Sequence, residues 1–275
     1  MQITTTLFVA TWLLMVGVPS WAQSKQQHEF CDRPLRVALV EFGLLYRSAT
    51  QDGIDARVLD VLEKRTGCKL IRVSLPRARI WAELKTGAVD MATAAVSTPE
   101  REAYAYMLPY LQLRNVVLVR SEVAKQVPTQ KAFESSALRI GVVRSFRHEP
   151  AFDALIANMH SQKRVVETSD IDDLMRMLQR RVVDAILCPP ILHPETLKQQ
   201  LVVRDWAPKE QMVLANLTLT HKAFTLEQAE HWNEVLETIR KDGTLHSIAN
   251  AFLVPADANN LFYTGTRQRL AAASP

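Results

Sequence analysis

The chain has 275 residues, of which 48% are apolar and 23% are charged, and its net charge is +4, a composition typical of a globular protein with one or two domains. Acidic and basic residues alternate, as in 55–65 and 227–241, and do not form the Lys/Arg-rich block of a nucleic-acid-binding surface. We therefore expect no nucleic-acid partner.

The N-terminal segment indicates export. Residues 7–18 form an almost unbroken apolar run, and small residues at Ser20 and Ala22 fit a cleavage site before Gln23, although residues 1–6 contain no Lys or Arg. The run is shorter than a membrane-spanning helix requires. We predict a signal peptide over residues 1–22 and a mature protein in the periplasm.

The segment that follows alternates between Val- and Leu-rich runs and amphipathic runs. The patterns predict strands at 35–40, 69–75 and 89–96, and helices at 55–65 and 78–85. Gly67 and Gly87 are expected to end the two helices. An alternating order of strands and helices favours a parallel α/β sheet.

The same order is repeated further along the chain. Strands are predicted at 138–143, 164–167 and 183–188, and helices at 151–159 and 170–180, the second capped by Ser169 with Asp172. An extended strand at 211–220 precedes a helix from a Thr225–Gln228 capping box to Arg240 and a short helix at 245–252. The tail 256–275 has no periodicity, and we expect it to be flexible.

Three cysteines constrain the redox environment. Cys31 precedes the first predicted strand and Cys68 follows the first helix, so export would favour a structural disulfide between them. A zinc site is the competing interpretation, but there is no C-x-x-C motif and no histidine pair at ligand spacing. We expect no metal and no cofactor. Cys188 ends an apolar run and is interpreted as a buried thiol.

Four short motifs, in this order along the chain, carry a family resemblance. They are Gly53-Ile54-Asp55 with Gly67, Trp81-x-x-Leu84-x-x-Gly87-x-Val89-Asp90, Ser97-Thr98-Pro99-Glu100-Arg101 followed by Pro109-Tyr110, and Lys241-Asp242-Gly243-Thr244-Leu245. Together they resemble the bacterial extracellular solute-binding proteins of family 3, the amino-acid-binding receptors of ABC importers. The similarity covers about residues 34–253.

The resemblance implies a two-lobed α/β fold of the periplasmic-binding-protein type II kind. Two parallel or mixed sheets flanked by helices would be joined by two crossover strands. Lobe 1 would comprise 23–120 plus 216–255 and lobe 2 would comprise 121–215, with hinges near 119–122 and 214–217. The resemblance also implies a monomer that closes around a small ligand and then docks on the membrane permease of an ABC importer.

The resemblance assigns the first ligand contacts to the segment around Arg101. In the family, the arginine of this motif binds the ligand's carboxylate, a task suited to the planar guanidinium fork. A surface ion pair with Glu100 or Glu102 is the alternative. Ser97 and Thr98 would offer a hydroxyl and backbone groups, or would simply cap the following helix.

Further candidates lie on three loops. Phe42 would form an aromatic wall or pack in the core, and Glu41 would provide a counter-charge for a ligand amine. Arg77 lies where relatives have an aromatic residue. The turn Arg144-Ser145-Phe146-Arg147 lies where the family presents backbone N–H groups to an anion, although exposed arginines are commonly only solvated.

One departure from the family pattern bears on the ligand. Amino-acid receptors of the family have an aspartate for the ligand ammonium after the strand equivalent to 184–187, and this chain has Cys188-Pro189-Pro190 there. A buried ammonium without a counter-charge is costly. We therefore predict an anionic, carboxylate-bearing ligand, unless Glu41 or backbone carbonyls hold an amine.

Two alternatives to transport remain. Some relatives of the family are exported cyclohexadienyl-type dehydratases, which act on prephenate-like acids and would need an acid such as Glu41 or Glu149 in the cleft. No nucleophile elbow or metalloprotease motif is present, and we expect a binding protein and not an enzyme. The other alternative is a soluble ligand sensor that docks on a membrane receptor.

Overall fold

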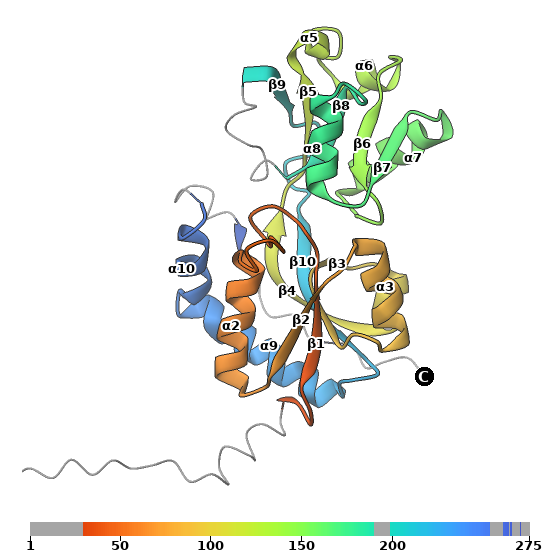
Figure 1. Cartoon of the computed structure of the whole chain (residues 1–275). Coiled ribbons are helices and arrows are strands. Elements are labelled where there is room, and N and C mark those ends of the chain that lie inside the picture. Colours follow the sequence, from red (N-terminus) through yellow and green to blue (C-terminus); the bar gives the residue numbers. More distant parts are fainter. Residues whose placement is uncertain (1–29, 190–198, 254–260, 264, 266–269, 271–275) are drawn as a thin grey trace, which may run out of the picture.

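The structure is a computed structural model that describes residues 30–189, 199–253, 261–263, 265 and 270. The predicted signal peptide over 1–22 lies outside the described residues. Among the described residues, no helix combines the length and the apolar character needed to cross a bilayer. The fold has two lobes, each built on one mixed five-stranded sheet flanked by helices, as predicted (Figure 1).

The sheet of the first lobe has the strand order β2-β1-β3-β10-β4. Its strands are β1 (Leu35–Leu39), β2 (Leu70–Ser74), β3 (Met91–Val96), β4 (Ala105–Leu113) and β10 (Val213–Thr220). The first three are parallel, and β10 runs antiparallel to both β3 and β4. Strand β3 is apolar and buried between its neighbours, as expected for the centre of a sheet covered on both faces.

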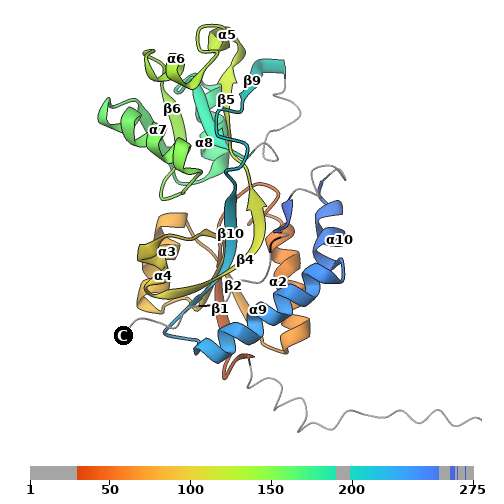
Figure 2. The ribbon, with the colours of Figure 1, turned by 180° about the vertical axis from the view of Figure 1, so that it is seen from behind.

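Helices cover both faces of this sheet. They are α2 (Ile54–Thr66), α3 (Arg77–Thr86), α4 (Pro99–Glu102), α9 (Leu226–Lys241) and α10 (Thr244–Asn250). Figure 2 shows α2, α9 and α10 on one side of the strands and α3 on the other. Gly67 and Gly87 end α2 and α3 in the left-handed conformation, and the Thr225–Gln228 capping box begins α9, so these predictions are confirmed.

The sheet of the second lobe has the order β7-β6-β8-β5-β9. Its strands are β5 (Val116–Arg120), β6 (Ile140–Val143), β7 (Val165–Thr168), β8 (Ala185–Cys188) and β9 (Leu201–Arg204), and its helices are α5 (Ser121–Ala124), α6 (Gln130–Glu134), α7 (Pro150–Ser161) and α8 (Ile171–Gln179). The cap of α8 is Asp170, which accepts a hydrogen bond from the backbone of Asp173, and not the predicted Ser169.

The two crossovers lie a few residues from the predicted hinges. The chain passes from β4 to β5 through Arg114 and Asn115, and from β9 to β10 through 205–212. Because β5 pairs with β8 and β9, residues 116–120 belong to the second sheet and not to lobe 1. Because β10 pairs with β3 and β4, residues 213–215 belong to the first sheet and not to lobe 2. Pairing across a sheet, which local sequence does not encode, decides these boundaries.

Arg114 ties the two crossovers together. Its guanidinium donates to the Asp205 carboxylate, with Nη2 to Oδ1 at 2.6 Å, and to the carbonyls of Ala207, Pro208 and Gln211. One side chain of the first crossover therefore holds much of the second.

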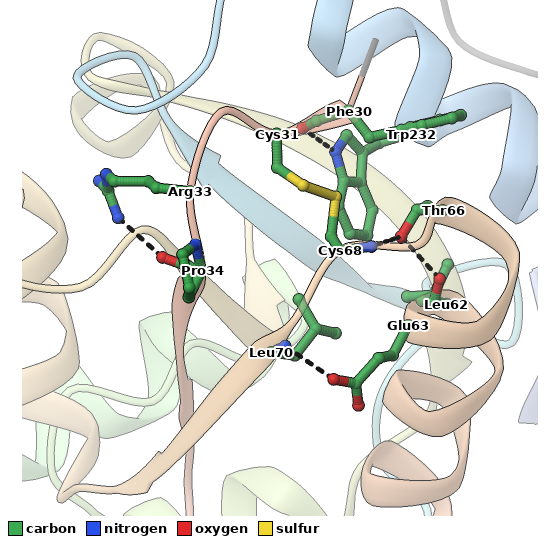
Figure 3. The surroundings of a disulfide bond; sticks show 10 residues. All are labelled: Phe30, Cys31, Arg33, Pro34, Leu62, Glu63, Thr66, Cys68, Leu70 and Trp232. Atoms are coloured by element: carbon green, nitrogen blue, oxygen red, sulfur yellow. Dashed lines mark hydrogen bonds between the residues drawn. A yellow bond between two sulfur atoms is a disulfide. The ribbon is translucent and has the colours of Figure 1, made fainter. Parts of the chain in front are cut away.

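The predicted disulfide between Cys31 and Cys68 is present. Figure 3 shows that it links the segment before β1 to the loop after α2. Next to it, the indole Nε1 of Trp232 on α9 donates to the carbonyl of Phe30 at 3.0 Å, which fastens the same segment to α9. Cys188 is buried and free, and burial raises the pKa of its thiol to about 12.

The described part of the C-terminal tail is not loose, contrary to the prediction for 256–275. Leu261 and Phe262 are buried, and Phe262 forms a bridge with Leu111 at the end of β4. The backbone N–H of Tyr263 donates to the carbonyl of Tyr110 at 3.1 Å. Apolar side chains without periodicity were read as disorder, whereas here they cover the edge of a sheet; the remaining tail residues lie outside the described part.

Candidate ligand-binding cleft

A small cavity lies between the lobes, next to both crossovers. Its volume is about 30 Å³, and its lining comes from both lobes and both crossovers: Phe42, Arg77, Trp81, Ala94, Val96, Arg101, Leu113, Asn115, Ser145, Phe146, Arg147, Pro189 and Val213. Such a volume accommodates one or two water molecules and not an amino acid. The lobes are therefore closed on their own side chains.

Arg101 is the central cation of the cleft. It lies on the single turn of α4, where the hydroxyl of Thr98 accepts a hydrogen bond from its backbone N–H. Its guanidinium stacks on the Trp81 ring, 3.7 Å from the ring centroid, and donates to the carbonyls of Val96 at 2.6 Å and Ser145 at 3.1 Å. The stacked ring and the two carbonyls together fix the orientation of the guanidinium.

The charge of Arg101 is compensated only at a distance, by Glu100 and Asp153. Burial, reinforced by the neighbouring Arg147, lowers the pKa of Arg101 to about 10, so the group remains protonated at neutral pH. Among the described residues, no carboxylate lies within ion-pair distance of it. A buried cation whose acceptors are neutral carbonyls gains from a carboxylate ligand.

Arg77 also lines the cleft, but its guanidinium donates its hydrogen bonds to the backbone of its own lobe. Both terminal nitrogens donate to backbone carbonyls of β3, Nη1 to Thr93 at 3.1 Å and Nη2 to Ala94 at 3.0 Å. Burial lowers the pKa of Arg77 to about 10, and the buried Asp55 carboxylate opposes that shift. The group is therefore a fixed cation in the cleft floor, with its counter-charge behind it.

Asp55 and Tyr110 form the support behind Arg77. The Tyr110 hydroxyl donates to Asp55 Oδ1 at 2.5 Å and accepts from the N–H of Ala94 at 3.1 Å. Ala94 has a positive φ of 50°; its N–H donates to Tyr110, and its carbonyl accepts from Arg77. Burial raises the pKa of Asp55 to about 6. The hydroxyls of Tyr110 and Thr93 and the charge of Arg77 act in the opposite direction and lower this pKa.

The second lobe contributes a turn after β6 that enters the cleft. The ring of Phe146 meets Phe42 edge to face at 5.0 Å between centroids, and lies 5.2 Å from the guanidinium carbon of Arg77. Ser145, before it, has a positive φ of 63° and directs its carbonyl at Arg101. In the closed structure, this turn contacts the first lobe through a carbonyl and an aromatic ring.

The structure brings together six of the ten predicted ligand-binding residues around the cavity: Phe42, Arg77, Arg101, Ser145, Phe146 and Arg147. Of the described residues, the other four do not contribute to its lining. Glu41 accepts from the backbone and hydroxyl of Ser48, and Ser97 donates to Glu102. Thr98 caps α4, and Arg144 pairs with Glu167 at 3.0 Å.

A second, larger cavity opens beside the first. Its volume is about 500 Å³, and it shares Trp81, Arg101, Ser145, Phe146 and Arg147 with the cleft. Beyond these residues it extends along α7 to His160 and across to Tyr104. Phe146 and Arg101 therefore lie between a nearly filled cleft and a roomy outer cavity.

Trp81 and Asp55 are the main residues that sequence reasoning missed as parts of the site. Trp81 follows Arg77 by one helical turn, so the two side chains share a face of α3, and this spacing was available as a signal. Asp55 belongs to the motif Gly53-Ile54-Asp55. A charged residue on the apolar face of a predicted helix was the signal that could have pointed to it.

Comparison with known proteins agrees with this architecture. Residues 38–255 match the family described as bacterial extracellular solute-binding proteins, family 3, and the chain belongs to that family. No curated protein matches the sequence.

Three solved structures illustrate the range of similar folds. One is the amino acid ABC transporter substrate-binding protein AbpA from Streptococcus pneumoniae bound to L-arginine (TM-score 0.66, 15% identity, covering 82% of this chain and 94% of that one). Another is the ancestral amino acid-binding protein AncCDT-1, a precursor of cyclohexadienyl dehydratase (TM-score 0.67, 16% identity, covering 85% of this chain and 100% of that one). The third is a histidine kinase sensor domain with similarity to periplasmic binding proteins (TM-score 0.67, 15% identity, covering 80% of this chain and 96% of that one). At these identities the similarity establishes the fold alone.

Proposed function

We propose that this protein binds a small carboxylate-bearing solute between its lobes and presents the closed form to a membrane partner. The observation that carries the proposal is Arg101, a buried guanidinium at the lobe interface whose acceptors are neutral carbonyls. Pro189 supports an anionic ligand over an amino acid, because it lines the cleft where the family's ammonium-binding aspartate was expected.

Closure would couple binding to shape. The ligand contacts on the first lobe and the turn 145–147 of the second come together only when the two crossovers bring the lobes close. A ligand that touches both lobes therefore shifts the population toward the closed state. The partner would recognise that state and not the ligand itself.

The setting we propose is the periplasm, and the partner the permease of an ABC importer. The family, the apolar segment at 7–18 and the Cys31–Cys68 disulfide support an oxidising, extracytoplasmic compartment. A role as a ligand sensor for a membrane receptor is the second candidate, supported by the similarity to a histidine kinase sensor domain.

An exported dehydratase is disfavoured by where its candidate acids lie. Glu149 is buried, and its two oxygens accept from the backbone and side-chain amides of Asn115 at 2.7 and 2.8 Å, which fixes it as a brace of the first crossover. Glu41 is engaged by Ser48. Neither carboxylate faces the cavity.

The test is a thermal-shift panel of amino acids and carboxylates on the mature protein, with Arg101→Ala and the control Arg79→Ala. Arg79 lies on α3 of the same lobe, but it is exposed, is paired with Glu83 and does not line the cleft. We expect a carboxylate to raise the melting temperature of wild type and Arg79→Ala, and to leave Arg101→Ala unchanged. Equal stabilisation of all three proteins, or turnover of a prephenate-like acid, would contradict the proposal.

A further inference from the structure

We propose that the ligand is an aromatic carboxylate, whose ring replaces Phe146 and whose carboxylate replaces the Ser145 carbonyl on Arg101. This inference rests on the proposed function and names the chemical class of its ligand. In the closed structure, two adjacent residues of the second lobe occupy the cleft of the first and satisfy its two binding features. The turn thus serves as an internal ligand.

The first feature is the acceptor position on Arg101. Nη1 is taken by the carbonyl of Val96, which belongs to the same lobe, while Nη2 is taken by the carbonyl of Ser145 from the opposite lobe. A guanidinium binds a carboxylate more strongly than a neutral carbonyl. The Ser145 carbonyl is therefore the contact that an anionic ligand would displace.

The second feature is a ring-binding position on the first lobe. Phe42 is buried and presents its ring to the edge or face of a partner. Arg77 is held by two carbonyls of β3, so its flat guanidinium faces the cleft in a fixed orientation, near enough to Phe146 for a cation–π contact. An aliphatic group of a ligand would gain only apolar contact there, whereas an aromatic ring would gain the ring contact with Phe42 and the cation–π contact with Arg77.

The covalent structure of the turn limits the spacing between the two features. The Ser145 carbonyl carbon is joined to the Phe146 ring through the backbone N, Cα and Cβ of Phe146. A ligand that takes over both contacts therefore needs a carboxylate linked to an aromatic ring by a short chain of no more than three atoms. Benzoate, phenylacetate and 3-phenylpropionate provide linkers of zero, one and two atoms.

The structure also provides room for the internal ring to leave. The cleft itself, at about 30 Å³, has no space for a second ring. Phe146 also lines the outer cavity of about 500 Å³, and Ser145 before it is exposed and has a positive φ. Rotation of this exposed turn would transfer the ring to the outer cavity and leave its position in the cleft to the ligand.

Displacement has a measurable consequence. A ligand that competes with an internal ring can bind only those molecules in which the position is free. Its apparent dissociation constant is therefore the intrinsic one divided by the fraction of such molecules. Removal of the ring in Phe146→Ala should therefore tighten binding of an aromatic carboxylate by about tenfold. Phe146→Leu, which loses the aromatic contacts with Phe42 and Arg77 but keeps an apolar side chain there, should tighten binding by less, and serves if the alanine variant is unstable.

The experiment is isothermal titration of the mature protein at neutral pH with the three acids named above. The tightest of them is then compared with its cyclohexyl counterpart, which lacks the aromatic face, and with its amide, which lacks the charge. We expect the acid to bind wild type at least about tenfold more tightly than either analogue, and Phe146→Ala to bind it more tightly still. Arg101→Ala should lose the preference for the acid over the amide.

Failure of this inference can be told apart from failure of the proposed function. If aliphatic carboxylates bind as tightly as aromatic ones and Phe146→Ala changes nothing, the aromatic assignment is wrong, while a loss of that binding in Arg101→Ala keeps the proposed function. If no carboxylate binds either wild type or Phe146→Ala, both fall.

Discussion

The two sheets have the same plan: three parallel strands, then a strand antiparallel to the third, then an edge strand that returns antiparallel to it. Even the aromatic residues at the cleft correspond, because Phe42 and Phe146 each lie three residues beyond the end of an equivalent strand, β1 at Leu39 and β6 at Val143. The lobes differ in how firmly they hold their cleft residues.

In the first lobe, the cleft side chains are anchored from behind. Arg77 and Arg101 project from helices, and each donates to backbone carbonyls of β3, which is itself braced by the Asp55–Tyr110 pair. In the second lobe, most cleft residues belong to one turn, in which Ser145 and Arg147 are exposed. The comparison suggests a division of labour, with a preformed binding half and an adaptable closing half.

The largest effect we expect comes from the disulfide, which strengthens only the first lobe. Replacement of Cys31 and Cys68 by serine opens a loop with a sequence separation of 37 residues, and in the chain-entropy model this lowers the free energy of unfolding by roughly 4 kcal/mol. Chemical denaturation monitored by tryptophan fluorescence measures it. A loss below about 1 kcal/mol would mean that the first lobe does not depend on this link.

The buried carboxylate of the first lobe predicts a pH effect of opposite sign to that of a paired surface acid. Burial raises the pKa of Asp55 from 3.8 to about 6 in the folded protein, so the native state binds more protons than the unfolded state between these values. Stability should therefore fall by about 3 kcal/mol in total as the pH rises from well below 4 to well above 6. Asp55→Asn lacks this contribution.

The measurement is the difference in unfolding free energy between Asp55→Asn and wild type at several pH values. This difference should move in favour of the variant as the pH rises through that window, even if loss of the Asp55 charge destabilises Arg77 at every pH. Asp60→Asn, on the exposed side of α2, is the control. If this difference does not change with pH, or moves in favour of wild type, the pKa of Asp55 is not raised in the folded protein.

The smallest effect concerns the crossovers, which connect the anchored half to the adaptable one. Arg114→Ala removes a charge-assisted contact with Asp205 and three bonds to carbonyls, and should cost about 2 kcal/mol of stability. Arg144→Ala, which breaks an exposed pair with Glu167, should change stability by less than about 0.5 kcal/mol.

Small-angle scattering sharpens the same comparison. Arg114→Ala should also broaden the distribution of lobe separations, since the second crossover loses its tie to the first, whereas Arg144→Ala should leave it unchanged. If both variants scatter like wild type and unfold alike, Arg114 does not restrain the hinge.

Much of the fold could be predicted from the sequence, because the signals are local. Apolar periodicity located the five predicted helices and strands of each repeated unit to within a few residues, and Gly67, Gly87 and Thr225 marked helix ends correctly. The errors occurred where distant partners decide: β5 was not recognised as a strand of the second sheet, and Phe262 was taken as part of a loose tail.

The site was predictable as a set of residue types but not as an arrangement. By itself, the sequence determined the order of strands and helices, the family motifs and the arginine of α4, because each depends on neighbours along the chain. Only the tertiary structure decided that Arg101 meets a carbonyl 44 residues away and that Phe146 fills the cleft. Those contacts arise from the closure of two lobes on each other, and no local pattern of side chains records how two separately folded surfaces meet.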